Sequence, residues 1–499
     1  MGPDTGSRHH RCARRGRLIS WACRFAAKKY PLSGQENHAG WTGETENGPH
    51  HPMTDRMFPL TRRHLLAGIG GVAWCRAGAA RSEPAGSGAR ALTLEAVPAK
   101  LPLREGQPDS AVWALRAEGT DPARRFWQGE TLELTVSNTL PAPLALNWHG
   151  LDGLASVVPL MARSPLPPGG TDRLSLPLRQ AGTFLCDARL LGDDLLSPSA
   201  ACALIVAERT PAPVDRDELI LIEDWRLGRD GEPVAPAKGA QDVPPLYTVN
   251  GKVAPLDITA RVHERIRFRF INACQRNAIA LRIEKLEARV MAIDSQPAEP
   301  FLARNGQMVL APGTRIDAFV DVALAEKSGS TIVLHDGHAP RPLVTIRTTS
   351  EKPIRDAPLA IPSPLPSNGL PHKLDLKTAL RIEMKLDGPN GSGSGWPRPS
   401  RFDSRAAPAF RVKQGRTVVL TVTNAAPMPM AFHLHGHHVR LLDRLDDGWK
   451  PFWLDTLLIE AGRTHRMAFA AEFTGSWLME AMAVQWGTPR LIRWFAVDQ

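Results

Sequence analysis

Histidines gather in two short segments of the chain, and their spacing suits a transition metal. Residues 432–438 read Phe-His-Leu-His-Gly-His-His, and residues 147–150 read Asn-Trp-His-Gly. Because alternate residues of a strand share a face, His433, His435 and His437 would project together. Imidazole is a common ligand of copper and zinc. The spacing predicts a metal site, and the alternative is a histidine-rich surface strand.

The elements that must position these histidines follow a pattern that recurs three times. Each copy is a turn, an alternating apolar strand and an Asn, at residues 131–138, 266–272 and 417–424. A Gly followed by a second alternating strand comes after each copy, at residues 169–176, 313–320 and 462–469. Helical periodicity is scarce, and 41 glycines and 44 prolines supply turns. The repeat predicts an all-β chain of three tandem β-sandwiches.

Proline-rich stretches mark the boundaries between these sandwiches. Residues 208–216 and 350–371 have the composition of linkers. We therefore expect a first domain at residues 90–207, a second at 217–349 and a third at 372–499.

The first eighty residues differ from the rest of the chain. Residues 1–52 show no sustained apolar period, so we interpret them as a disordered or mis-annotated extension. Residues 53–80 contain Arg62-Arg63, an apolar run at 65–74 and small residues at 77–80, the order of a twin-arginine signal peptide. The alternative is a chance basic pair before a short helix. The signal predicts export to the bacterial periplasm.

The net charge of +10 at first suggests a polyanion partner. However, the first 80 residues hold 12 of the 61 basic residues and only 5 of the 51 acidic residues. Most of the excess positive charge thus belongs to residues 1–80, the leader of the chain. We therefore expect no nucleic-acid partner. No run of 18 apolar residues occurs, so we also expect no integral membrane segment in the mature chain.

Three cysteines follow the leader: Cys186, Cys202 and Cys274. Cys186 and Cys202 lie in neighbouring apolar runs, and an antiparallel pairing could bring them within bridging distance. A disulfide and two free buried thiols are both compatible with the sequence.

Several of these segments together resemble the multicopper oxidase superfamily. The resemblance covers residues 90–499 and rests on motifs at 148–150, 182–184, 247–251 and 433–437, which read Trp-His-Gly, Gly-Thr-Phe, Tyr-Thr-Val-Asn-Gly and His-Leu-His-Gly-His. It implies three cupredoxin-like Greek-key β-sandwiches. In that family a type 1 copper lies in the last sandwich, and a trinuclear copper cluster lies between the first and the last.

The chain departs from the family at most copper-ligand positions. Asn147 replaces the leading histidine of the first motif, and Asp187 and Arg189 replace the histidines of the second. The positions aligned with the type 1 ligands and the remaining cluster ligands hold Met430, Glu480, Ala481, Met482 and Trp486. Only His149, His433 and His435 remain at matching positions, so oxidase activity of the family's type is not expected.

The charged replacements suggest a new role for the former cluster region. We expect Arg189 to bridge Asp187 and Glu480, because buried charges persist only when they are paired. His149, His433 and His435, with or without Asp187, could hold one copper or zinc ion, and the alternative is that they bind no metal.

The resemblance extends to a copper-free, exported cell-division protein of the superfamily. It implies a periplasmic, non-catalytic scaffold or binding protein, related to the cell envelope or to division, with an unidentified protein partner. The alternative is an oxidoreductase or metal-handling protein with a residual copper site at His149, His433 and His435.

Overall fold

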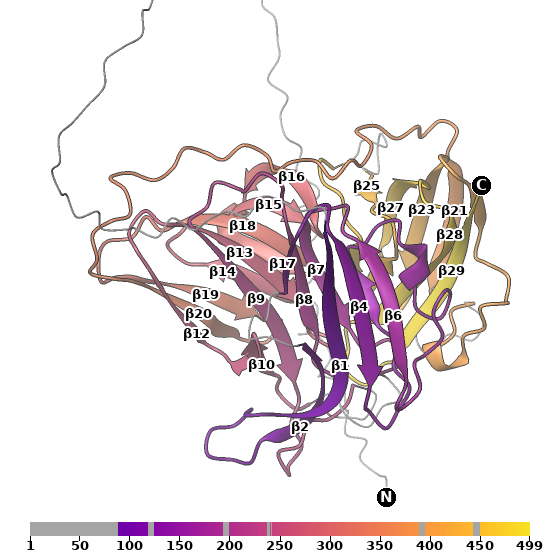
Figure 1. Cartoon of the computed structure of the whole chain (residues 1–499), viewed down its shortest axis with the longest axis horizontal. Helices are drawn as coiled ribbons and strands as arrows, with labels where there is room; N and C mark the ends of the chain where they lie inside the picture. Colours follow the sequence, from indigo (N-terminus) through magenta and orange to yellow (C-terminus); the bar gives the residue numbers. More distant parts are fainter. Residues whose placement is uncertain are drawn as a thin grey trace, which may run out of the picture. The chain divides into compact units, whose positions relative to one another are not determined.

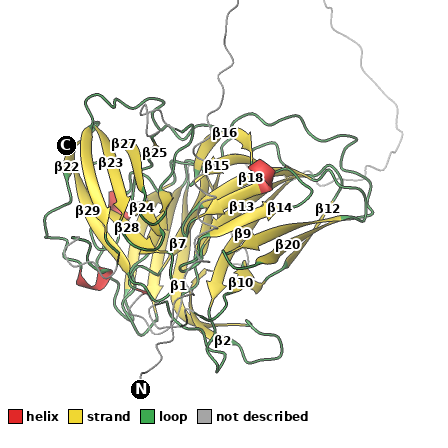
Figure 2. Cartoon of the chain, turned by 180° about the vertical axis from the view of Figure 1, so that it is seen from behind, coloured by secondary structure: helices red, strands yellow, loops and turns green. Residues whose placement is uncertain are grey.

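The computed structural model describes residues 88–117, 124–192, 199–236, 240, 242–388, 395–442 and 450–499. The expected extension at 1–52 and the expected signal at 53–80 lie outside these residues. Within the described ranges, strands form nearly all the regular structure, and helix is limited to short 3-10 turns (Figure 2). These turns are η1 (Ala155–Val157), η3 (Arg304–Gly306) and η4 (Pro399–Arg401). The prediction of an all-β chain is confirmed.

The first sandwich consists of two four-stranded sheets with the orders β2-β1-β4-β6 and β3-β8-β7-β5. In the first sheet, β1 runs parallel to β4, and β4, β6 and β1 lie side by side in Figure 1. The strands are β1 (Ala89–Leu101), β2 (Ser110–Ala117), β3 (Arg125–Trp127), β4 (Thr131–Asn138), β5 (Asn147–His149), β6 (Thr171–Pro177), β7 (Gly182–Asp187) and β8 (Cys202–Ala207).

The middle sandwich has a seven-stranded sheet, β11-β10-β9-β13-β18-β15-β16, and a five-stranded sheet, β12-β20-β19-β14-β17. The strands are β9 (Arg216–Trp225), β10 (Leu246–Val249), β11 (Lys252–Val253), β12 (Leu256–Ala260), β13 (Arg265–Asn272), β14 (Ile279–Ile283), β15 (Arg289–Ile293), β16 (Gln296–Leu302), β17 (Gln307–Leu310), β18 (Arg315–Asp321), β19 (Gly329–His335) and β20 (Pro340–Thr348).

The last sandwich has a four-stranded sheet, β21-β23-β27-β25, and a five-stranded sheet, β22-β29-β28-β24-β26. The strands are β21 (Leu380–Leu386), β22 (Arg411–Lys413), β23 (Thr417–Asn424), β24 (Met430–Leu434), β25 (Arg440–Leu441), β26 (Thr456–Ile459), β27 (Thr464–Ala470), β28 (Gly475–Ala483) and β29 (Arg490–Asp498). The three pairs of sheets confirm the predicted cupredoxin-like architecture.

The repeated Asn closes each sandwich in the same way. Asn138, Asn272 and Asn424 are all buried, and each side-chain amide donates two hydrogen bonds of 2.9–3.0 Å to backbone carbonyls. Each side-chain oxygen also accepts the N–H two residues on, at 3.0 Å. The backbone carbonyls of these residues accept from the glycines of the second pattern: Gly169, Gly313 and Gly462. The repeat therefore encodes a hydrogen-bonded closure between two antiparallel strands.

Strand β13 shows how the middle sandwich is built against the first. Ile266, Phe268 and Phe270 lie in the middle core, whereas Arg267 and Arg269 alternate with them and are also buried. Arg267 pairs with Glu208 at 2.9 Å, and Arg269 donates to Thr183 of β7 at 2.8 Å. The alternation thus gives β13 an apolar face for its own core and a cationic face for the first sandwich.

A search of the described residues finds no helix long and apolar enough to cross a membrane.

Candidate metal and charge centre

Two pairs of strands bring the expected site residues together. In the first sandwich, β5 and β7 are antiparallel neighbours, and Asn147 stands opposite Asp187. In the last sandwich, β24 and β28 are antiparallel neighbours, and His433 stands opposite Glu480. Positions that are far apart in the sequence therefore become adjacent through sheet register alone.

Asp187, His433 and Glu480 line a small cavity of about 20 Å³. That volume holds about one water molecule or one ion. The lining combines imidazoles, carboxylates and guanidinium groups with apolar and sulfur-containing side chains. It consists of His149, Leu185, Asp187, Arg189, Ala273, Cys274, Pro312, Gly313, Ala431, His433, Glu480, Met482 and Arg490.

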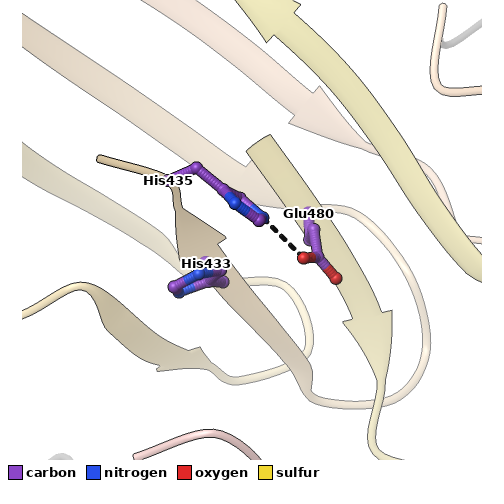
Figure 3. Close-up of side chains that lie close together, drawn as sticks. All are labelled: His433, His435 and Glu480. Atoms are coloured by element: carbon purple, nitrogen blue, oxygen red, sulfur yellow. Dashed lines mark hydrogen bonds and ion pairs between the residues drawn. The ribbon is translucent and has the colours of Figure 1, made fainter. Parts of the chain in front are cut away.

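The three expected imidazoles lie in one cluster. The ring centroids of His149 and His433 are 4.1 Å apart, and those of His433 and His435 are 4.6 Å apart. All three side chains are buried. One potential ligand atom from each of His433, His435 and Glu480 lies within 4.8 Å of the others, so the close group contains a carboxylate in place of His149 (Figure 3).

His433 is held in one tautomer by its neighbours on the β26 side. Its Nδ1 lies 3.0 Å from the Thr456 hydroxyl and 3.2 Å from the Asp455 carbonyl. The Thr456 hydroxyl donates its own proton to Asp455 Oδ1 at 2.8 Å, so it accepts from His433. A carbonyl also only accepts, and Nδ1 therefore carries the proton. Nε2 of His433 is left with a lone pair, buried and without a hydrogen-bond partner among the described residues.

Both carboxylates of the site are paired. Glu480 Oε1 lies 2.6 Å from His435 Nε2, and Glu480 Oε2 accepts from Arg490 at 2.7 Å. Burial alone would raise the pKa of Glu480, but the Arg490 charge and the His435 hydrogen bond hold it well below its usual range. Asp187 Oδ2 lies 3.5 Å from His149 Nε2. Burial would also raise the pKa of Asp187, and its contact with His149 and the charge of Arg490 outweigh that effect and lower it.

Burial favours the neutral form of His149 and of His435. It lowers the pKa of His149 to about 4, with a further contribution from nearby His433 and opposition from Asp187. Burial likewise lowers the pKa of His435, against the hydrogen bond to Glu480. These two imidazoles are therefore neutral beside two ionised carboxylates.

The expected Arg189 bridge between Asp187 and Glu480 is wrong. The Arg189 guanidinium pairs with Glu223 of β9 at 2.7 Å and also donates to the carbonyls of Ser199 and Ala273. Only its backbone N–H reaches Asp187, at 2.8 Å. Glu480 takes Arg490 of the neighbouring strand as its cation instead. The middle sandwich supplies the partner for Arg189, and the charge of Arg490 acts on both carboxylates of the site.

The expectation that His437 shares a face with His433 and His435 is also wrong. Strand β24 ends at Leu434, and Gly436 turns the chain with a φ of 69°. The His437 ring then lies among Phe469, Phe473, Trp477 and Phe495, with centroids 5.0–5.8 Å away. His437 is a residue of the aromatic core of the last sandwich.

The positions aligned with the type 1 copper ligands are apolar in this chain. Met430 and Ala481 belong to the core of the last sandwich, and Trp486 is buried against the Arg226 guanidinium, 5.0 Å from its ring centroid. A type 1 copper depends on a thiolate and two imidazoles. No cysteine follows Cys274 in the sequence, so the last sandwich has no thiolate to offer. These residues do not fit a type 1 copper.

Sequence reasoning missed a second buried polar centre, where three sandwiches meet. His438 Nδ1 lies 2.7 Å from Asp152 Oδ2, and His438 Nε2 lies 2.6 Å from the Asp294 carbonyl. Arg315 of β18 forms two hydrogen bonds, of 2.7 and 2.9 Å, with Asp455. No sequence motif predicts these partners, because the residues come from all three sandwiches.

The cysteines of the described residues are free and buried. Cys186 of β7 stands directly opposite Cys202 of β8. Of the two arrangements compatible with the sequence, the structure has the free thiols.

Family models match the first and the last of the three sandwiches that line the cavity. A model described as multicopper oxidase matches residues 100–205, and another with the same description matches residues 374–499.

Curated relatives include both a division protein and an oxidase. The chain is 27% identical over 412 residues to cell division protein FtsP of Sodalis glossinidius, covering 72% of this chain and 83% of that protein. It is 24% identical over 408 residues to FtsP of Pectobacterium atrosepticum, covering 73% and 82%. It is also 24% identical over 446 residues to multicopper oxidase MmcO of Mycobacterium tuberculosis, covering 78% and 83%.

Solved structures share the fold. A multi-copper oxidase from Pseudomonas thermotolerans superposes with a TM-score of 0.70 at 22% identity, covering 82% of this chain and 99% of that one. One from Pseudomonas parafulva gives a TM-score of 0.68 at 23% identity, covering 81% and 99%. The chain thus contains two domains that match multicopper oxidase family models, and it shares the fold of solved multicopper oxidases.

Proposed function

We propose that this chain is a non-catalytic member of its family that acts in cell division or in the upkeep of the cell envelope. It would act in the periplasm, after export by the twin-arginine route, and bind a protein partner through its surface. Similarity to the FtsP proteins over 72–73% of the chain supports the division-related role.

The observation that carries the proposal is the apolar type 1 position. An oxidase of this family needs an electron entry site with a thiolate ligand. Met430 and Ala481 fill that position with core side chains. Without an electron entry site, the sandwiches retain their scaffold and lose multicopper oxidase chemistry.

The proposal is tested with the mature chain, without residues 1–80, after incubation with copper. We expect no blue type 1 absorption band and no oxygen consumption with phenolic substrates. A gene-deletion strain should show longer, undivided cells under envelope stress, and the wild-type gene should restore normal length. Normal division in the deletion strain, or sustained copper-dependent oxygen uptake, would overturn the proposal.

A second candidate function rests on the imidazole cluster. We propose as the alternative that His149, His433 and His435 retain a copper ion for an oxidoreductase or metal-handling activity. The 4.1 Å separation of the His149 and His433 rings favours this candidate. Stoichiometric copper that is lost in His149→Ala, His433→Ala and His435→Ala alike, together with copper-dependent turnover, is the result expected of it.

A further inference from the structure

The polar side of the cavity has a donor set that differs from a copper cluster. His433 lines the cavity, and its Nε2 has an unshared lone pair without a hydrogen-bond partner among the described residues. One potential ligand atom from each of His433, His435 and Glu480 lies within 4.8 Å of the others. Figure 3 shows the His435 and Glu480 side chains directed toward each other, with the His433 ring beside them. An unpaired buried acceptor costs free energy unless a ligand satisfies it.

We propose that His433 Nε2, His435 Nε2 and Glu480, at the edge of this cavity, bind one divalent ion of the zinc class. Two imidazoles and one carboxylate form a recognised ligand set for zinc with one open coordination position. The set contains no thiolate, so it differs from the ligand set of a type 1 copper. The ion would replace the hydrogen bond between His435 and Glu480, and the proton on His435 Nε2 would be released or move to Nδ1 when Nε2 binds the metal.

The surroundings of His433 are those of a metal ligand. Ligating histidines almost always donate the second ring N–H to a carbonyl or carboxylate, which fixes the tautomer. His433 Nδ1 donates to the Asp455 carbonyl and to Thr456, and Asp455 is in turn held by Arg315. The tautomer of His433 therefore leaves the Nε2 lone pair available for a metal ion without any rearrangement of the ring.

The cavity also limits what the ion can do. A volume of about 20 Å³ admits the ion or a single water molecule and leaves no room for an organic substrate. The ion would hold β24 to β28 within the last sandwich. This role is independent of the proposed division function, and metal binding and division can fail separately.

The experiment uses the mature chain, stripped of metal by a chelator and titrated with zinc chloride. Calorimetry and native mass spectrometry should find one zinc ion per chain, and zinc should raise the melting temperature. His433→Ala and Glu480→Gln should each weaken zinc binding by more than about 100-fold, because both remove a ligand. His335→Ala, on β19 of the middle sandwich, is the matched control and should bind like the wild type.

Two further variants separate the possible ligand sets. Thr456→Val should weaken zinc binding by about 10- to 100-fold, because it removes one partner of Nδ1 and leaves the ligands in place. His149→Ala should keep the stoichiometry and change affinity by less than about 10-fold. A loss in His149→Ala as large as that in His433→Ala would overturn the assignment of Glu480 in favour of three imidazoles.

Cobalt substitution provides a test that does not depend on the folding of a variant. Cobalt bound by two imidazoles and a carboxylate in a buried cavity should give the intense visible bands of a four- or five-coordinate ion. The weak spectrum of a six-coordinate aqueous ion would contradict the site, as would the absence of zinc binding by the wild type. Binding of two or more copper ions that are lost together in His433→Ala would also overturn it.

Discussion

Asp152 of the first sandwich and His438 of the last form a buried ion pair, with 2.7 Å between Oδ2 and Nδ1. Burial would lower the pKa of His438, but attraction to Asp152 and the hydrogen bond between them raise it to about 9. Asp455 lies 3.8 Å from the other ring nitrogen and is paired with Arg315. The Asp294 carbonyl accepts at the same nitrogen, so all three sandwiches depend on the protonated ring.

Stability should fall at alkaline pH through His438. The native chain keeps a proton that the unfolded chain releases at the ordinary histidine pKa of 6.5. The stabilisation of the folded chain by protonated His438 is therefore fully present below pH 6.5 and is lost as the pH rises through about 9. By linkage, this loss lowers the free energy of unfolding by roughly 3 kcal/mol. Asp294 adds to the same trend at lower pH, because burial and Asp455 raise its pKa to about 6.

Urea unfolding at about pH 6 and about pH 10 measures this loss. His438→Gln should have a lower free energy of unfolding than the wild type at about pH 6, and this free energy should change less between the two pH values. His335→Gln serves as the control and should follow the wild type. An equal change of unfolding free energy with pH in wild type and His438→Gln would exclude His438 as the titrating group.

Arg315→Met should destabilise the chain by about 3 to 5 kcal/mol. The change leaves Asp455 buried without its cation and removes the donor to the Thr183 carbonyl, which lies 3.2 Å from Nε. Arg411→Met is the matched control, because Arg411 pairs with Asp498 at the surface, where solvent screens such pairs and they add little to stability. Chemical denaturation of both variants at the same pH gives the comparison, and similar losses would refute the argument.

Asn424→Ala should cost about 2 to 4 kcal/mol. The substitution leaves the carbonyls of Met428 and Ile459 and the N–H of Ala426 buried without the partners they now have. Gln414→Ala, at an exposed position of the same sandwich, should change stability by no more than about 0.5 kcal/mol. Thermal melting distinguishes the two, and a neutral Asn424→Ala would show that the repeated Asn does not close the sandwich.

The three thiols of the mature chain should resist alkylation until the chain unfolds. All three are buried, which shields them from the reagent. Burial also raises the pKa of Cys186 and of Cys274, whereas the hydrogen bond with Cys186 lowers the pKa of Cys202, so Cys202 is protected by its burial alone. Mass spectrometry should find no labelled cysteine in the native chain and three in the denatured chain. One labelled cysteine after denaturation, with a mass two hydrogens lower, would instead reveal a Cys186–Cys202 disulfide.

The fold was predictable because its repeat is local. The alternating strands that end at Asn138, Asn272 and Asn424, and the glycines after them, carry their own hydrogen-bond closure. Each closure needs only residues within one sandwich. The order of the repeats therefore indicated the number of sandwiches.

The charge partners of the site were not predictable in the same way. We assumed that Arg189, Asp187 and Glu480 would compensate one another, because all three replace ligands of one cluster. The actual partner of Arg189 is Glu223, on a strand with no recognisable motif, and that of Glu480 is Arg490, ten residues along the chain. Such pairings depend on how the faces of different sheets meet, and strand periodicity carries no information about that.

Gly436 restricts how this site could change during evolution. A Cβ atom at this position would lie 1.9 Å from the Trp477 ring, and the φ of 69° disfavours other residues as well. A sequence that placed the His437 ring beside His433 would have to change both the turn at Gly436 and the Trp477 ring beneath it. A further imidazole therefore cannot be recruited to the cavity from this turn by a single substitution.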